Sequence, residues 1–181
     1  NWTNQTTNKS NSLRVLITGA SGFVGKKACS YLAKFGHEIT ANSRNKCEFP
    51  LNIKFVQGEN IFNKDPKGSV FGGYDCIVHL AGRTSSKDIG NTNSYSPYFK
   101  DNVQETIKLA EFCANSNVKR FIYMSSIKVN GESTSESMPF SENDIPNPQD
   151  YYAISKYEAE LGLLEIAKKS NMEVVIVRPP L

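Results

Sequence analysis

The sequence predicts an α/β fold, a doubly wound parallel sheet with helices on both faces. Two observations predict it. Short runs rich in Val and Ile alternate along the chain with amphipathic stretches, and a glycine-rich segment directly follows the first of these runs. Parallel strands covered on both faces contain such near-continuous apolar runs, and alternating β and α segments favour right-handed crossovers.

The elements can be placed in order along the chain. The expected strands are Arg14–Thr18, Glu38–Ser43, Ile53–Gln57, Cys76–Leu80, Arg120–Ser125 and Glu173–Arg178. The expected helices are Val24–Phe35, Tyr98–Ala114 and Tyr151–Ser170. Pro97 precedes the second helix, where a missing N–H costs little. One apolar face of that helix is formed at helical spacing by Val103, Ile107, Ala110 and Ala114.

Length and composition predict one domain over residues 13–181, preceded by a polar, disordered tail over residues 1–12. A net charge of +3 gives no reason to expect nucleic acid or a membrane surface as a partner. No apolar run approaches the length of a membrane span. The chain ends directly after the sixth expected strand, so we expect the domain to be cut short there and a C-terminal substrate domain to be missing.

The four cysteines have neither a close pair nor metal-ligand spacing, and Cys29, Cys76 and Cys113 fall inside expected elements. We therefore expect reduced thiols in a cytoplasmic protein. His37 and His79 lack a second ligand at metal spacing, so we expect structural histidines and no metal site.

The glycine-rich segment Thr18–Gly25 places glycines at positions 19, 22 and 25 between a strand and a helix. A sharp turn, a close approach of the backbone to a pyrophosphate and tight packing of helix on sheet each favour a residue without a Cβ. The helix N-terminus adds free N–H groups for phosphate. This segment predicts a dinucleotide site.

Two further patterns point to chemistry. Tyr152 and Lys156 lie four residues apart on the third helix, so both side chains can face one cleft, where an ammonium is expected to lower the pKa of the phenol. Ser125 and Ser126 come at the end of the fifth strand, where ligands bind in open α/β sheets. A serine hydroxyl there can hydrogen-bond the reacting oxygen of a substrate.

Together these patterns resemble the extended short-chain dehydrogenase/reductase family, in its NAD-dependent epimerase/dehydratase branch. The resemblance covers Leu13–Leu181 and includes the family's Rossmann fold. The matching segments are TGxxGxxG at Thr18–Gly25, HLAG at His79–Gly82, NxxxT at Asn102–Thr106, SSxxVxG at Ser125–Gly131, YxxxK at Tyr152–Lys156, and Arg178-Pro179.

The resemblance implies roles for particular residues. The catalytic set is Ser126, Tyr152 and Lys156, with Ser125 as an alternative to Ser126. The implied cofactor contacts are Gly19, Ser21, Gly22, Phe23, Val24, Gly25, Ser43, Arg44, Glu59, Asn60, Leu80, Ala81, Gly82, Asn102, Tyr152, Lys156 and Pro179. The implied substrate is a nucleotide sugar, and the implied assembly is a homodimer through a four-helix interface formed by the second and third helices.

Some positions depart from the family's pattern. Ser43 stands where NAD-preferring members carry an acid, and Arg44 can pair with a 2′-phosphate, so we expect NADP, with NAD as the alternative. Arg44 can equally be an exposed loop charge. Lys128 is unusual, and Asn130 replaces an aromatic residue; both are expected near the substrate.

The expected reaction is hydride transfer at a sugar carbon, by a 4-epimerase or a 4-keto reductase. Two alternatives stay open: a reductase of a non-sugar carbonyl, and a non-catalytic NADP-binding sensor. We expect the 181-residue chain itself to bind cofactor without turning over substrate.

Overall fold

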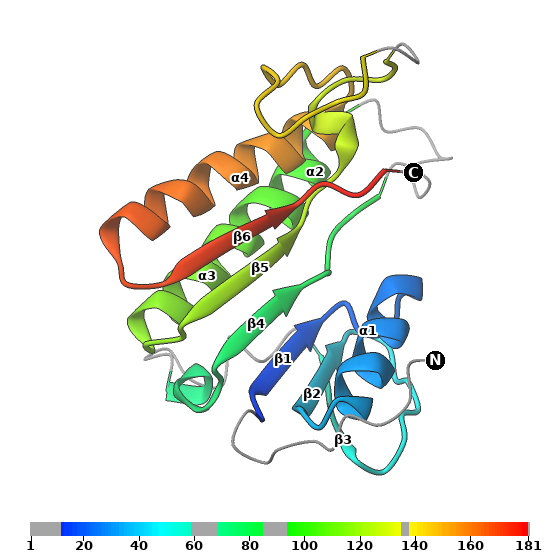
Figure 1. The fold of residues 1–181 in the computed structure, drawn as a ribbon, viewed down its shortest axis with the longest axis vertical. Coiled ribbons are helices and arrows are strands. Elements are labelled where there is room, and N and C mark those ends of the chain that lie inside the picture. The colour runs from blue at the N-terminus through cyan, green and yellow to red at the C-terminus, as the bar shows by residue number, and fades with distance from the viewer. Residues whose placement is uncertain (1–11, 59–68, 85–93, 135–137, 181) are drawn as a thin grey trace.

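A computed structural model describes residues 12–58, 69–84, 94–134 and 138–180. Within them, parallel strands form a six-stranded sheet in the order β3-β2-β1-β4-β5-β6 (Figure 1). The strands are β1 (Arg14–Thr18), β2 (Glu38–Ser43), β3 (Ile53–Gln57), β4 (Cys76–His79), β5 (Arg120–Met124) and β6 (Glu173–Val177). The order reverses direction between β1 and β4, which marks the ligand-binding crevice of this architecture. The expected Rossmann-type fold is confirmed.

The element bounds follow the sequence-based expectation closely. β1, β2 and β3 match it, while β4, β5 and β6 each end one residue earlier. The long helix α1 (Phe23–Lys34) begins and ends one residue earlier than expected, and α4 (Tyr151–Lys169) ends one residue earlier. Two short 3₁₀ helices, η2 (Ser69–Gly73) and η5 (Ile127–Val129), were not expected from the sequence.

The helix expected over Tyr98–Ala114 is not uniform. It consists of a short α2 (Ser96–Tyr98), a π-helical turn η4 (Phe99–Gln104) and α3 (Glu105–Asn115). A π-turn inserts an extra residue, rotates the residues after it and occurs mostly at functional sites. As a result Leu109 and Cys113, which the simple periodicity did not select, are fully buried.

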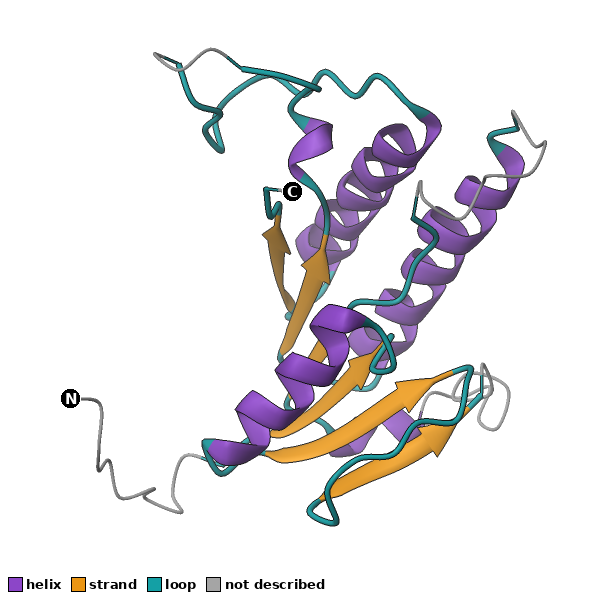
Figure 2. Cartoon of the chain, turned by 90° about the vertical axis from the view of Figure 1, so that its right-hand side faces the viewer, coloured by secondary structure: helices purple, strands orange, loops and turns teal. Residues whose placement is uncertain are grey.

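Helices cover the sheet unevenly (Figure 2). On one face, α3 and α4 bury Leu16, Ile77 and Phe121 together with Leu109 and Leu163. On the other face, α1 packs over β1 and β2, whose Val15, Ile17 and Ile39 surround Cys29. Neighbouring strand residues point to opposite faces, which is why Leu16 and Ile17 belong to different cores.

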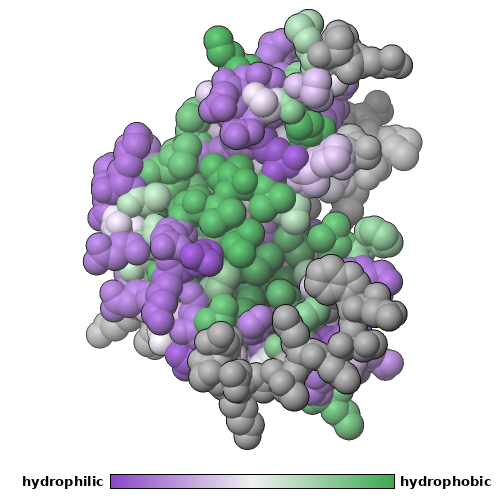
Figure 3. Space-filling view, in the orientation of Figure 1, coloured by the Kyte–Doolittle hydropathy of each residue, from purple (hydrophilic) through white to green (hydrophobic). Residues whose placement is uncertain are grey.

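The face of the sheet that carries α1 is open over β5 and β6. Val175 and Val177 on this face are 40% and 37% exposed. Figure 3 shows the resulting apolar surface in the middle of the molecule, over β4, β5 and β6. Among the described residues, the sheet is therefore covered on both faces at β1 and on one face at β6.

The cysteines are free thiols, and Cys29, Cys76 and Cys113 are buried as expected. Burial raises the pKa of Cys29 and of Cys76 to about 11 in each case, which keeps both protonated. No group of three metal-binding side chains occurs among the described residues. In that same part of the chain, no helix has the length and apolarity needed to cross a bilayer.

Candidate active site

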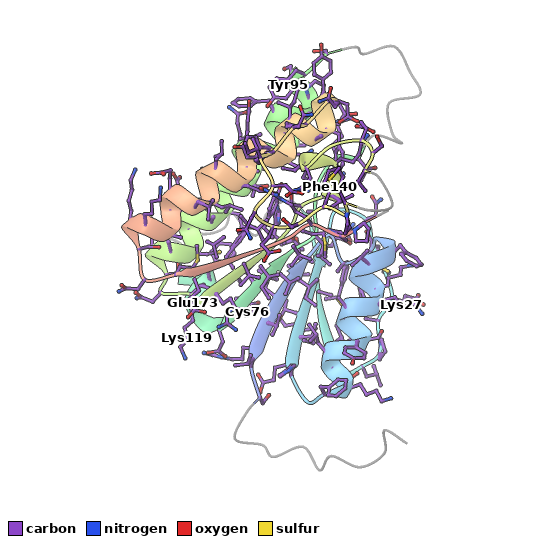
Figure 4. All side chains as sticks on the ribbon, turned by 45° about the horizontal axis from the view of Figure 1, so that its top comes forward. Lys27, Cys76, Tyr95, Lys119, Phe140 and Glu173 are labelled. Atoms are coloured by element: carbon purple, nitrogen blue, oxygen red, sulfur yellow. The ribbon has the colours of Figure 1, made fainter. Side chains whose placement is uncertain are left out.

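The carboxyl ends of the parallel strands lie along one edge of the sheet, and the segments that follow them form the candidate site. Figure 4 shows Phe140 toward this edge and Lys119 and Glu173 toward the opposite one. Phe140 closes over Gly131, where an added Cβ would stand 3.1 Å from its ring. Ligands of open α/β sheets bind at this edge.

The turn between β1 and α1 is shaped by two glycines that tolerate no side chain. Gly19 has a φ of +67°, and a Cβ on it would stand 2.6 Å from the backbone nitrogen of Ala81. A Cβ on Gly25 would stand 2.4 Å from the carbonyl oxygen of Gly19. Gly22 donates its N–H to the same oxygen at 3.0 Å. The glycine spacing thus allows α1 to begin close against β1 and β4.

The first turn of α1 is suited to an anion. Gly22 is the N-cap residue of α1. Within the described part of the chain, no side-chain hydrogen bond caps this end of the helix, and its first turn contains no acidic residue. Free N–H groups and the positive end of the helix dipole therefore face the crevice. Phe23 and Val24 are 84% and 48% exposed beside it, and Ser21 is half-buried. These features fit the pyrophosphate of a dinucleotide.

His79 is a structural residue at the end of β4. Its Nδ1 lies 2.7 Å from Thr18 Oγ1 and its Nε2 lies 3.0 Å from Thr106 Oγ1. Complete burial, reinforced by the charge of Lys156, lowers the pKa of His79 to about 3. The neutral ring therefore ties β1 and β4 to α3. Thr106, within the NxxxT segment, was given no role from the sequence.

Asn102, expected to contact the cofactor, forms hydrogen bonds within the protein through its side-chain amide. Its Oδ1 accepts the N–H of Arg83 at 2.7 Å, and its Nδ2 donates to the carbonyl of Arg83 and to Ser155 Oγ. Gly82 sits close by, because a Cβ there would stand 2.9 Å from Asn102 Oδ1. The buried amide in the π-turn therefore fixes Arg83, in the loop after β4, against Ser155 of α4. Leu80 and Ala81, earlier in the same loop, lie against Gly19.

Ser126 and Tyr152 come together between the end of β5 and the first turn of α4. Ser126 is buried, and its Oγ accepts the N–H of Lys128 at 3.2 Å. Burial raises the pKa of the Tyr152 phenol, and a hydrogen bond with Ser126 partly offsets this effect. The expectation that a neighbouring ammonium leaves the phenol with a lowered pKa is therefore wrong for this structure, because desolvation dominates.

The position of Lys156 explains this result. Its Nζ donates to the carbonyl oxygen of Met124 at 2.9 Å and lies 4.7 Å from the centre of the Tyr123 ring. The same Nζ is 5.9 Å from the centre of the Tyr152 ring. Burial lowers the pKa of Lys156 to about 8, with a smaller opposing effect of Glu160. The ammonium is therefore near the phenol ring but is hydrogen-bonded to the backbone of β5.

Ser125 faces a different group. Its hydroxyl donates to Glu160 Oε1 at 2.5 Å, and Arg178 binds both carboxylate oxygens of Glu160. Arg178 also donates to Asn130 Oδ1 at 3.0 Å. The Ser125 hydroxyl is therefore bound within this buried network and is directed to Glu160 rather than to Tyr152. Glu160, four residues after Lys156 on the same helix face, was missed from the sequence, although its spacing could have revealed it.

The remaining expected contacts lie around the crevice. Ser43 is buried, and its hydroxyl donates to the carbonyl of Asn45 at 2.5 Å; Arg44 is exposed. The carbonyl of Pro179 accepts the N–H of Ile127 at 3.1 Å, which fastens the turn after Ser126 to the end of β6. Glu59 and Asn60, like tail residues 1–11, lie outside the described residues.

Known proteins have sequences similar to this chain. The model of the NAD dependent epimerase/dehydratase family matches residues 15–181. The chain is 36% identical to a UDP-glucose 4-epimerase of Vibrio cholerae over 91% of this chain and 50% of the relative. It is 28% identical to a GDP-6-deoxy-D-mannose reductase of Pseudomonas aeruginosa over 92% of this chain and 51% of the relative.

Solved structures show the same fold. MoeE5 in complex with UDP-glucuronic acid and NAD aligns with a TM-score of 0.76 and 26% identity, over 91% of this chain and 54% of that one. A UDP-glucuronic acid 4-epimerase from Bacillus cereus aligns with a TM-score of 0.78 and 24% identity, over 93% of this chain and 56% of that one.

The chain spans about half the length of the curated relatives it matches. The family model, by contrast, covers nearly all of this chain, from β1 to its last residue. The chain therefore belongs to the NAD dependent epimerase/dehydratase family.

Proposed function

We propose that the protein is an NAD-dependent enzyme that acts on a nucleotide sugar by hydride transfer at a sugar carbon. The observation that carries this proposal is the meeting of Ser126, Tyr152 and Lys156 at the sheet edge that also holds the glycine turn. Because the chain spans about half the length of its relatives, the activity is proposed for the whole protein.

In this proposal Tyr152 is the general acid/base. Because burial raises its pKa, the phenol is protonated at neutral pH, which suits delivery of a proton to a carbonyl oxygen. The Ser126 hydroxyl, already oriented by the N–H of Lys128, orients and polarises the same oxygen. Lys156 supplies a buried cation close to both groups, and it also binds the nicotinamide ribose.

The cofactor is held by the glycine turn, the first turn of α1 and the loop after β4. When bound, it supplies the acceptance and donation of a hydride. We propose NAD as this cofactor, since NAD is present in the MoeE5 complex. The NADP preference expected from Arg44 finds no support in the comparisons. Titration with both cofactors, in wild type and in Arg44→Ala, tests this point. If wild type binds NADP much more tightly than NAD and Arg44→Ala loses this preference, the proposal of NAD is contradicted.

Two reactions fit the site equally well, a 4-epimerisation and the reduction of a 4-keto sugar. The Vibrio cholerae relative is named as an epimerase, and the Pseudomonas aeruginosa relative is named as a reductase. A reductase of a non-sugar carbonyl is the second candidate. It is favoured by a 25% identical relative, the 2-alkyl-3-oxoalkanoate reductase of Stenotrophomonas maltophilia. A non-catalytic sensor remains the third, opposed by the presence of Tyr152 and Lys156.

The experiment is an incubation of the whole protein with NAD or NADH and a panel of UDP-, GDP- and dTDP-sugars, including 4-keto forms, followed by NMR. An epimerase equilibrates two sugars without net change of cofactor. A 4-keto reductase oxidises one NADH for each sugar reduced. Turnover of 3-oxo acids with no turnover of any sugar nucleotide would contradict the sugar proposal. Cofactor binding without turnover of either class would support the sensor.

We also propose a homodimer formed through α3 and α4 in a cytoplasmic protein. Leu161 and Leu164 on α4 are 46% and 43% exposed, which suits a helix packed against another subunit. Sedimentation of wild type and of Leu161→Glu tests the dimer. A monomeric wild type at micromolar concentration would contradict it.

A further inference from the structure

The turn that follows Ser126 carries a lysine that the proposed chemistry does not use. The Lys128 side chain is 16% exposed and lies between two carboxylates. Its Nζ is 3.1 Å from Glu132 Oε1 and hydrogen-bonds to Asp150 Oδ2. The backbone N–H of Lys128 donates to the Oγ of Ser126. One residue therefore contacts Ser126 through its backbone and a distant helix through its side chain.

That helix is α4, and Asp150 is its N-cap. The second carboxylate oxygen of Asp150 accepts the N–H of Ala153 at 2.7 Å. Tyr152 lies in the turn that this cap stabilises. The contact between Lys128 and Asp150 thus joins the turn that carries Ser126 to the turn that carries Tyr152.

Charges around the Tyr152 phenol come from each element packed on it. Asp150, on its own helix, raises the pKa of the phenol, while Lys128 and the hydrogen bond from Ser126 lower it. The Nζ of Lys156 lies 5.9 Å from the ring centre, and Tyr123 faces the same space from β5. The capping carboxylate thus works against phenolate, and Lys128 offsets that effect.

We propose that Lys128 is a positioning residue: it holds Ser126 against Tyr152 and offsets the negative charge of the helix cap beside the phenol. This inference rests on the proposed function, since the two hydroxyls matter for turnover only if they carry the chemistry. Neither the glycine turn nor the family resemblance assigns this role to Lys128.

The test is an NMR titration of the tyrosine Cζ carbons in the ¹³C-labelled chain, with the Tyr152 signal identified by its loss in Tyr152→Phe. Lys128→Met should raise the pKa of the Tyr152 phenol by roughly half a unit or more. Lys128→Arg, which keeps the charge, should leave that pKa within about 0.2 unit of wild type.

A charge cycle gives the matched control. Asn also caps helices well, so Asp150→Asn removes the charge while keeping the cap. It should lower the pKa of the phenol, because Asp150 raises that pKa. Adding Lys128→Met to Asp150→Asn should then return the pKa toward that of wild type.

The proposal would be overturned if Lys128→Met had the same phenol pKa as wild type and the double variant had the same phenol pKa as Asp150→Asn alone. So would a shift of the same size in Lys128→Arg and Lys128→Met, because that would reflect disturbed packing. If Lys128→Met does not fold, the comparison of Asp150→Asn with the double variant decides the outcome. The titration needs no turnover, so the expected shifts support this inference even if the whole protein proves inactive, a result that would contradict the proposed function alone.

Discussion

The ammonium of Lys156 donates to the carbonyl oxygen of Met124 at 2.9 Å, which joins the second turn of α4 to the end of β5. The contact buries a charge whose pKa falls from its ordinary 10.5 to about 8. Lys156 is thus held at the site at a cost in solvation that the carbonyl and the Tyr123 ring partly offset.

This burial predicts a pH dependence of stability. Between pH 8 and 10.5 the unfolded chain keeps a proton on Lys156 that the folded chain has lost. The contribution of Lys156 to the free energy of unfolding therefore rises with pH in this window, by at most about 1.4 kcal/mol per pH unit. Urea denaturation at several pH values measures it as the difference between wild type and Lys156→Met. Parallel curves for the two proteins would show that the ammonium is not buried as described.

The neutral His79 predicts a dependence of the same sign at acid pH. Its ring stays unprotonated in the fold down to about pH 3, whereas the unfolded chain takes up a proton near pH 6.5. The stability associated with His79 is therefore present above pH 6.5 and is lost as the pH falls. His79→Gln should flatten the decline of the unfolding free energy between pH 6.5 and 5. An equal decline in wild type and His79→Gln would exclude the neutral ring.

The Glu160–Arg178 pair predicts a large loss of stability on removal of one partner. Glu160 is 2% exposed, and Glu160→Gln leaves the guanidinium without its carboxylate. We expect a loss of roughly 3 kcal/mol in the free energy of unfolding, as for other buried pairs. Glu165→Gln, which breaks a solvent-exposed pair with Lys168, should cost far less. Urea denaturation of both variants tests the difference, and equal losses would contradict a buried network.

The proposed acid/base role predicts a loss of activity without loss of cofactor. In the whole protein, Tyr152→Phe should lower kcat by roughly 10²- to 10⁴-fold and leave the affinity for NAD within a few-fold of wild type. Tyr151→Phe is the matched control, because Tyr151 is the exposed neighbour on the same helix. Steady-state kinetics with the substrate found in the NMR screen measures both. Full activity of Tyr152→Phe would remove this residue from the mechanism.

Much of the fold could be predicted from the sequence, because Val/Ile-rich runs and glycine spacing are local signals. β1, β2 and β3 begin and end where the pattern predicts. The π-turn at Phe99–Gln104 could not be predicted this way. It depends on the long-range contacts of Asn102 with Arg83 and Ser155, which no periodicity encodes.

Part of the candidate site could likewise be predicted from the sequence, and part of it could not. Spacing alone brought Tyr152 and Lys156 to one helix face, and the motif placed Ser126 beside them. The direction of the Tyr152 pKa shift was wrong, because a sequence contains the neighbouring charge but not the burial that outweighs it. Spacing could have placed Glu160 on the helix face of Lys156, but the partners of Lys128 and Glu160 lie 22 and 18 residues away, so both pairings required the structure.

The most direct test of the account is a calorimetric titration of this chain with NAD, in wild type, Gly25→Ala and Gly72→Ala. A Cβ on Gly25 would stand 2.4 Å from the carbonyl of Gly19, whereas one on Gly72 would meet nothing closer than 3.8 Å. We predict binding of one NAD to wild type and to Gly72→Ala, and at least about tenfold weaker binding to a folded Gly25→Ala, a change of about 1.4 kcal/mol. Equal binding by all three proteins, or no binding of NAD or NADP by wild type, would contradict the account.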